Sequence, residues 1–267
     1  MNPSSNQTFS FKRFKRFGRL FGRHTAEHLR GYVMSAAVLA GALLLVMSYV
    51  AYMMGGTLTT GVQMVFFILF ILGAGSLFNS TLFDDYGEKR RSIMILTLPA
   101  SHLEKFLVAW LYALPIFLMV FLGVFYLVDA AVVYGGAQPG QAPELLDIWV
   151  FTNLREAGSV FLYYAVVSGV WLWGSIFFEK GQFIKTAFAV FLGLGVLWLL
   201  NHQVLKQLIS PDLAPLPPFS RLAITEGGQS FMLSLPESQT AWLGLVPVAL
   251  AVLLWVAAYF RLTEKQL

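Results

Sequence analysis

The longest stretch without a charged residue constrains most strongly what this chain can fold into. The 53 residues from Gly31 to Phe83 contain no Asp, Glu, Lys or Arg. A helix needs about 20 apolar residues to cross roughly 30 Å of hydrocarbon, so this stretch is long enough for two crossings. Gly55 and Gly56 interrupt it, and paired glycines favour a turn. We therefore expect two membrane-spanning helices, at about 32–54 and 62–83, joined by a tight turn.

Four further apolar stretches each have the length of a single crossing. The six predicted spans are at about 32–54, 62–83, 106–129, 157–178, 183–201 and 239–260. Their apolar residues follow one another continuously, whereas the strands of a membrane barrel alternate every second residue. Only 12% of the residues are charged, about half the share in a soluble domain. We predict an all-α, polytopic membrane protein whose transmembrane domain covers 31–267.

Lysines and arginines are divided unevenly between the two sides of this arrangement. Of the 18, all but Arg155, Lys206 and Arg221 fall in the N-terminal segment, in the loops after spans two and four, or in the tail. Short cytoplasmic loops carry an excess of Lys and Arg. We therefore expect both termini to be cytoplasmic. No cleavable signal peptide is expected before the first span, which itself would direct insertion.

Residues 1–30 are predicted to form a basic amphipathic helix at the membrane interface. Phenylalanines recur at helical spacing with basic residues between them. The aromatic residues are Phe11, Phe14, Phe17 and Phe21, and the basic residues are Lys12, Arg13, Lys15 and Arg16. Such a helix lies among lipid headgroups, with its rings in lipid and its Lys and Arg on anionic phosphates. Two interpretations stay open: a topology anchor, or an interfacial helix that also contacts a cytoplasmic partner.

A five-residue pattern in the same segment matches the H-x-x-E-H signature of inverted zinc peptidases. It comprises His24, Glu27 and His28, and on a helix the two histidines share a face, as zinc ligands should. The pattern fixes only three positions, and the segment is a short basic helix, so a membrane metallopeptidase ranks as the weaker alternative. Glu27 also lies at helical spacing from Arg23 and Arg30, which predicts ion pairing on the helix surface.

The loop between spans two and three is the longest polar segment on the side expected to be cytoplasmic. Its predicted partner-binding residues are Asp84, Asp85, Glu88, Lys89, Arg90, Arg91 and Leu98. A short exposed helix with charged and apolar residues can dock a soluble partner, and the alternative is an elbow lying flat on the membrane. Pro99 ends this helix. Ser101 and Glu104 then have the spacing of a capping box, which predicts the beginning of span three.

The interiors of the predicted spans carry no Asp, Glu, Lys, Arg or His, and Asp129 lies at the far end of span three. Ion-coupled carriers need charged or broken-helix sites near the midplane. The chain has no phosphate-binding loop and no nucleophile elbow, so we do not expect it to be a P-loop ATPase on its own. Its basic residues lie close to the membrane, which indicates lipid contact and not nucleic-acid binding. Pro115 and Pro247 predict kinks in spans three and six.

The connection between spans five and six, at about 202–240, is the longest polar stretch on the opposite side. Its first half is rich in proline, and Leu222–Leu235 contains Gly227 and Gly228 near its middle. Paired glycines between two short runs of this kind predict a hairpin outside the membrane.

The layout resembles that of the membrane subunits of bacterial type-2 ABC (ATP-binding-cassette) transporters. The shared features are an amphipathic N-terminal helix, six spans with both ends inside, a cytoplasmic helix after span two and a long external segment before span six. The resemblance is densest from Gly87 to Ser101 and from Glu104 to Leu107, and the ending Tyr259–Leu267 is similar to the tails of some members. The family often has two short re-entrant helices before the last span, and the prolines and hairpin expected here depart from that pattern.

The resemblance implies the permease subunit of an ATP-driven exporter in the bacterial cytoplasmic membrane. It implies a second permease, either another copy or a different chain, and a separate cytoplasmic ATPase that binds Mg-ATP. Asp84 to Leu98 would be the coupling segment on that ATPase. No catalytic residue, metal ligand or cofactor is expected in this chain.

Three other classes stay open. A non-transporting membrane scaffold or sensor would have no ATPase partner. A membrane metallopeptidase using His24, Glu27 and His28 would bind stoichiometric metal. A secondary carrier would require an essential Asp129 and would transport without ATP.

Overall fold

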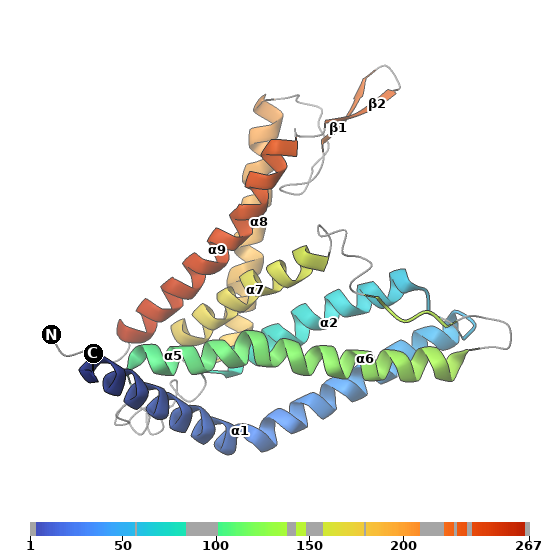
Figure 1. Ribbon diagram of the computed structural model, residues 1–267. Helices are drawn as coiled ribbons and strands as arrows, with labels where there is room; N and C mark the ends of the chain where they lie inside the picture. The colour runs from blue at the N-terminus through green and yellow to red at the C-terminus, as the bar shows by residue number, and fades with distance from the viewer. Residues whose placement is uncertain are drawn as a thin grey trace.

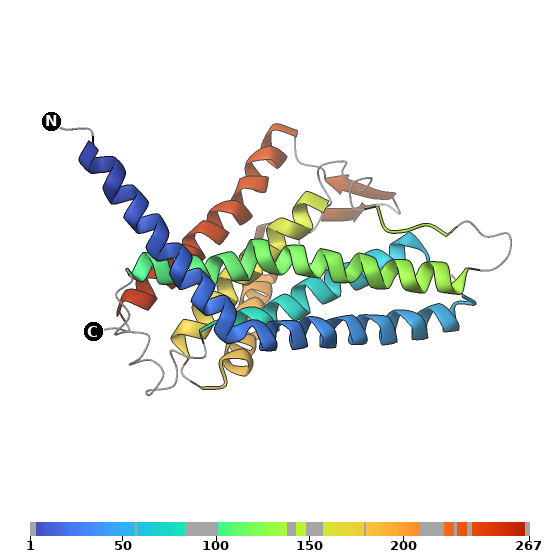
Figure 2. The same cartoon turned by 60° about the horizontal axis from the view of Figure 1, so that its bottom comes forward.

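The computed structural model describes residues 4–56, 58–83, 101–137, 143–147, 157–178, 180–208, 222–226, 229–233 and 237–264. Its described part contains six helical segments that are long and apolar enough to cross a membrane, as the sequence predicts. The chain is thus a multi-pass membrane protein. Figure 1 shows the segments as a bundle from which α8 and α9 diverge, and Figure 2 shows the same divergence from a second direction.

The helices and strands occur in the order α1, α2, α5, η1, α6, α7, α8, β1, β2, α9. Their bounds are Ser4–Met53 (α1), Thr60–Thr81 (α2), His102–Leu111 (α5), Tyr112–Ile116 (η1), Phe117–Gly136 (α6), Ala157–Phe177 (α7), Gln182–Leu208 (α8), Leu222–Glu226 (β1), Gln229–Leu233 (β2) and Glu237–Glu264 (α9). Each predicted span corresponds to one helix or, for span three, to the continuous run of α5, η1 and α6.

Helix α1 joins the predicted interfacial helix and the first span into one element. It runs without interruption from Ser4 to Met53 and is visibly bent in Figure 1. The turn after it contains Gly55 with φ of 85° and Gly56 with φ of 107°. Only glycine adopts such values at little steric cost, so the paired glycines allow the chain to reverse within a few residues.

Span three is interrupted where Pro115 was expected to kink it. The helix changes to π geometry over Tyr112–Ile116, with Pro115 inside. Proline has no N–H to donate and clashes with the preceding turn, so a local change of helix type accommodates it. Pro247, by contrast, lies inside α9, which continues as an α-helix on both sides.

The predicted hairpin is confirmed by strands β1 and β2. They pair antiparallel, with Leu222 opposite Leu233 at one end and Glu226 opposite Gln229 at the other. The pairing closes across the Gly227-Gly228 dipeptide that the sequence singles out. Figure 1 places the hairpin beyond one end of α8 and α9.

Two buried clusters hold the bundle together. One extends along α1, α2, α6 and α7 and contains an aromatic series in which Phe67 meets Phe121 and Phe125 edge to face, at centroid distances of 5.4 and 5.1 Å. The other lies near the N-terminal half of α1 and joins α5 to α7 and α9 through residues such as Tyr112, Ile176 and Leu262. We call the end with the second cluster the basic end, because most of the described lysines and arginines lie there, and the opposite end the distal end.

Candidate functional site: the junction of the N-terminal helix with span three

Span three begins with a complete capping box. The Ser101 Oγ accepts a hydrogen bond from the Glu104 N–H at 3.2 Å, and the Glu104 Oε2 accepts one from the Ser101 N–H at 3.0 Å. These bonds satisfy two donors that a helix N-terminus leaves without partners. The capping box predicted from the sequence is thereby confirmed, and it fixes the start of α5 directly after the 84–98 segment.

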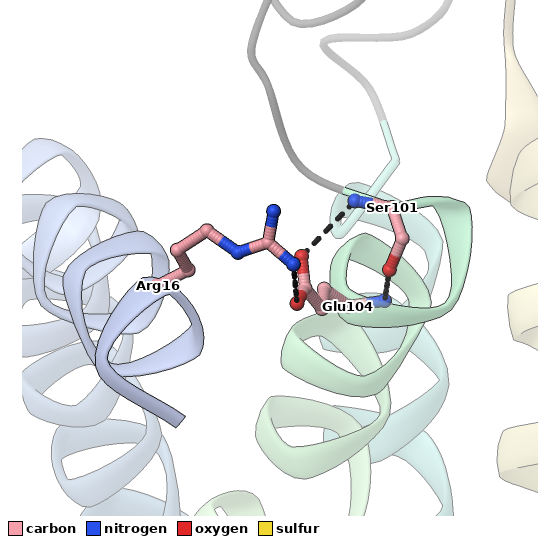
Figure 3. Close-up of polar contacts among 3 residues, drawn as sticks. All are labelled: Arg16, Ser101 and Glu104. Atoms are coloured by element: carbon pink, nitrogen blue, oxygen red, sulfur yellow. Dashed lines mark hydrogen bonds and ion pairs between the residues drawn. The ribbon is translucent and has the colours of Figure 1, made fainter. Parts of the chain in front are cut away.

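The same glutamate connects α5 to α1. Arg16 Nη2 lies 3.6 Å from Glu104 Oε1, while the other carboxylate oxygen of Glu104, Oε2, accepts the capping-box hydrogen bond (Figure 3). The side chain of Glu104 is only 12% exposed, whereas that of Arg16 is 55% exposed. An ion pair that solvent reaches on one side contributes about 0–1 kcal/mol, so the contact positions the two helices more than it stabilises them.

Aromatic contacts extend this junction further along each helix. The Phe21 ring stacks on the Tyr112 ring at a centroid distance of 5.3 Å. The hydroxyls of Thr25 and Tyr112 are 2.5 Å apart, and Thr25 Oγ1 also donates to the Phe21 carbonyl. Because a threonine hydroxyl has one proton, the Tyr112 hydroxyl is the donor between the two side chains. Tyr112 is the first residue of the π-turn, so α1 holds span three at the point where its geometry changes.

The far side of the π-turn is held by α7. In the π geometry the Phe117 N–H reaches back to the carbonyls of Leu114 and Tyr112 and not to that of Ala113. The Ala113 carbonyl instead accepts a hydrogen bond from the buried Tyr164 hydroxyl at 2.5 Å. Tyr164 belongs to α7, so side chains from α1 and α7 hold the π-turn from two directions.

Helix α9 completes the junction. Trp255 meets Trp110 edge to face at 5.4 Å, and Tyr259 meets Phe106 at 5.7 Å. Ala258 and Leu262 are fully buried in the same cluster. The start of span three is therefore surrounded by α1, α7 and α9.

The predicted coupling segment lies outside the described residues. This applies to all its predicted contact residues, Asp84, Asp85, Glu88, Lys89, Arg90, Arg91 and Leu98. The segment begins after Phe83, which is buried in the basic-end cluster, and ends before the capping box at Ser101. Both of its attachment points are thus parts of the junction.

The predicted interfacial residues divide into three groups. Phe11, Phe14, Lys12 and Arg13 lie in α1, but their side chains are outside the described part of the chain. Lys15 and Arg16 are exposed. Phe17 and Phe21 are half-buried and pack against the basic-end cluster, so this part of the aromatic stripe contacts protein.

The histidine pattern takes part in the aromatic network. His24 and His28 share a face, with ring centroids 4.6 Å apart, and His24 Nε2 lies 2.8 Å from the Tyr32 hydroxyl. Glu27 is turned away and accepts a hydrogen bond from Arg23 Nε at 2.7 Å, the ion pairing expected from helical spacing. Over the described ranges, no three His, Cys, Asp or Glu side chains gather in a metal-binding arrangement.

Sequence reasoning missed the residues that hold the π-turn, namely Thr25, Tyr112 and Tyr164. Tyrosines and threonines are common in apolar spans, and nothing in their spacing sets these three apart. Pro115 was the available signal, because a proline within a helix frees backbone groups that nearby side chains can satisfy.

No protein-family model, no curated protein and no solved structure matches the chain.

Proposed function

We propose that this chain is the membrane-spanning permease subunit of an ATP-driven exporter of the type-2 ABC kind. It works with a second permease, identical or different, and with a separate cytoplasmic ATPase that binds Mg-ATP. Both termini lie in the cytoplasm of a bacterial cell, and the ATPase binds the 84–98 segment. The proposal rests on the resemblance in layout and sequence set out above.

The observation that carries the proposal is the construction of the junction. The 84–98 segment enters α5 at a capping box whose glutamate also binds Arg16 of α1. A force applied to this segment therefore acts on the start of span three and on the N-terminal helix together.

A force on the start of span three would pass through the π-turn to the part of the span inside the membrane. Tyr112 ties the turn to α1, and Tyr164 ties it to α7. Single π-turns inside α-helices are rare and frequently lie at functional sites. Spatial continuity alone does not establish energetic coupling, so the role of the turn is tested below through variants.

The charge distribution favours a partner ATPase over an ion gradient as the source of energy. Asp129, the residue that a secondary carrier would need, accepts a hydrogen bond from the Leu146 N–H at 3.3 Å. This contact gives the carboxylate a structural role in connecting two parts of the chain. Asp129 also lies in the distal half of span three, seven residues before the end of α6 at Gly136, whereas coupling ions in carriers bind near the midplane.

The test is affinity purification of the tagged chain in mild detergent, followed by mass spectrometry and an ATPase assay. We expect a stoichiometric ATPase with a phosphate-binding loop, lost when Glu88 to Arg91 are changed to alanine. The matched control is Glu264→Ala with Lys265→Ala, which removes charges in the C-terminal tail and should leave the ATPase bound. Purification of the chain without any ATPase would contradict the proposal and favour a scaffold or sensor.

A further inference from the structure

A short extended segment lies across the distal end of the bundle. Residues 143–147, which we call the distal strap, have no regular secondary structure. The Leu146 side chain is 1% exposed and belongs to the cluster formed by α1, α2, α6 and α7. The strap therefore inserts a side chain into the bundle from its distal end.

Two polar side chains hold the backbone of the strap. Gln63 Nε2, on α2, donates to the Glu144 carbonyl at 2.9 Å and to the Leu58 carbonyl at 3.1 Å. Asp129 Oδ2, on α6, accepts a hydrogen bond from the Leu146 N–H. Gln63 and Asp129 are both 0% exposed. The two anchors come from different helices, and they bind backbone groups of Glu144 and Leu146, two residues apart.

This arrangement makes the strap sensitive to the spacing of α2 and α6. Both anchors fit only while the two helices keep their present separation. The end of α6 is also close-packed, since a Cβ on Gly136 would collide with the Gly56 carbonyl oxygen in the turn after α1. A relative movement of α6 must therefore disturb the turn after α1, the strap or both.

The Asp129 anchor is less favourable than the Gln63 anchor, because it buries a carboxylate. Asp129 Oδ1 and Gln63 Oε1 have no hydrogen-bond partner among the described residues, and both atoms are buried. Removing a carboxylate from water costs more free energy than one backbone hydrogen bond returns. Burial of Leu146 holds the strap closed, while hydration of Asp129 would favour its release. The buried carboxylate of Asp129 thus favours opening of the strap.

We propose that the distal strap is a latch that closes the external end of the permease and opens during the transport cycle. The proposal rests on the proposed function, because opening is driven by movement of α6 relative to α2. Span three contains the π-turn, so displacement at the junction reaches the Asp129 anchor through the same segment. Opening exposes Leu146 and Asp129 to the external solution.

The test uses the absence of cysteine from the chain. Leu146→Cys places a single thiol at the buried contact, and Glu144→Cys places one at an exposed strap position. Labelling by a membrane-impermeant maleimide is measured on the full-length chain in vesicles. We expect Leu146→Cys to react at least about tenfold more slowly than Glu144→Cys, since only the open state exposes it. Equal rates would show that the strap is not closed and would overturn the proposal.

Anchor variants in the Leu146→Cys background test the latch itself. Gln63→Leu removes the donor to the Glu144 carbonyl, so it should raise the labelling rate several-fold. Asp129→Asn keeps an acceptor oxygen for the Leu146 N–H and removes the buried charge, so labelling should stay slow or become slower. No effect of Gln63→Leu, or faster labelling with Asp129→Asn, would overturn the proposal. Elution volume and helical content confirm that each variant is folded.

The final arm adds Mg-ATP to the complex with its ATPase. We expect labelling of Leu146→Cys to increase, while labelling of Glu144→Cys stays constant. Unchanged Leu146→Cys labelling in an ATP-hydrolysing complex would overturn the latch and leave the proposed function standing. Failure to recover an ATPase, by contrast, would count against the proposed function.

Discussion

Helices α7 and α8 are neighbours along the chain but have very different surroundings. Half of the residues from Val160 to Phe177 of α7 are buried inside the molecule, whereas nearly all residues in the most apolar part of α8 are not. Helix α7 lies between α2 and α9, and small residues allow close approach: Gly75 of α2 meets the Tyr164 ring, and Gly169 meets Trp255. Most large apolar side chains of α8, such as Phe188, face outward. Equally apolar sequences thus serve as protein core in one helix and as outer surface in the other.

The comparison shows why the two helices should respond differently to mutation. In a membrane, apolar side chains gain nothing from leaving lipid, so packing depends on shape, small residues and hydrogen bonds. Helix α7 has all three, and α8 has few. We expect substitutions on α7 to affect folding, and substitutions on the outer face of α8 to affect only contacts with lipid or with the proposed second permease.

The largest effect is expected for Gly75→Val. A Cβ at Gly75 would collide with the Tyr164 ring, whereas a Cβ at Gly73 on the same helix meets nothing within 4 Å. Overpacking of this kind costs about 1–3 kcal/mol. Gly73→Val is the matched control, and thermal unfolding in detergent is the measurement. Similar melting temperatures for the two variants would contradict the close packing of α2 on α7.

A smaller loss is expected for Tyr164→Phe. The change leaves the buried Ala113 carbonyl without the hydroxyl that donates to it, and the net contribution of such a hydrogen bond is about 0.5–1.5 kcal/mol. Tyr163→Phe is the control, because Tyr163 is 59% exposed and one position away. The same unfolding assay applies. If Tyr164→Phe were as stable as Tyr163→Phe, the π-turn would not depend on α7.

Arg16→Ala should leave stability nearly unchanged but weaken the coupling between ATP hydrolysis and opening of the strap. Its exposed ion pair with Glu104 should contribute only about 0–1 kcal/mol to stability. The ATPase should still bind, because the 84–98 segment is intact, but ATP-dependent labelling of Leu146→Cys should fall. Arg19→Ala, also an exposed arginine of α1, is the control. Normal ATP-dependent labelling in Arg16→Ala would remove this ion pair from the mechanism.

The smallest effect on the isolated chain is expected for Phe191→Ala. Phe191 is 75% exposed on α8, so detergent replaces the contacts that lipid makes, and stability should change by less than about 0.5 kcal/mol. A loss as large as that of Gly75→Val would show that α8 is packed in the folded chain, and would remove the contrast with α7. A normal melting temperature combined with loss of the proposed permease pair would strengthen the contrast between α7 and α8. The outer face of α8 would then be the surface that binds the second permease.

The sequence predicted the elements of this fold better than their contacts. Uncharged stretches gave the six spans, Ser101 and Glu104 gave the start of span three, and paired glycines gave both the turn after α1 and the hairpin. These features are local, so nearby residues determine them. The uninterrupted helix α1 was not predicted, because the change from basic to apolar composition suggested a boundary that the backbone does not have.

The candidate site was predicted only in part, and the reason is physical. Helical spacing shows that Phe17 and Phe21 share a face, but lipid and protein interiors are equally apolar, so spacing does not show which one the face meets. The π-turn and the strap depend on residues far apart in the sequence, such as Tyr164 with Ala113 and Gln63 with Glu144. The coupling role of the residues from Asp84 to Leu98 stays a prediction, because these residues lie outside the described part of the chain.

The central claim is that a cytoplasmic ATPase acts on the 84–98 segment, and site-specific crosslinking in intact cells tests it most directly. A photoreactive group attached to Glu88→Cys should form a product with an ATPase that has a phosphate-binding loop. The same group at Lys206→Cys, on the side expected to be external, should not form it. A crosslink to the ATPase from position 88 alone is the result we expect. Labelling of lipid or of the chain itself from both positions, with no ATPase product, would contradict the claim.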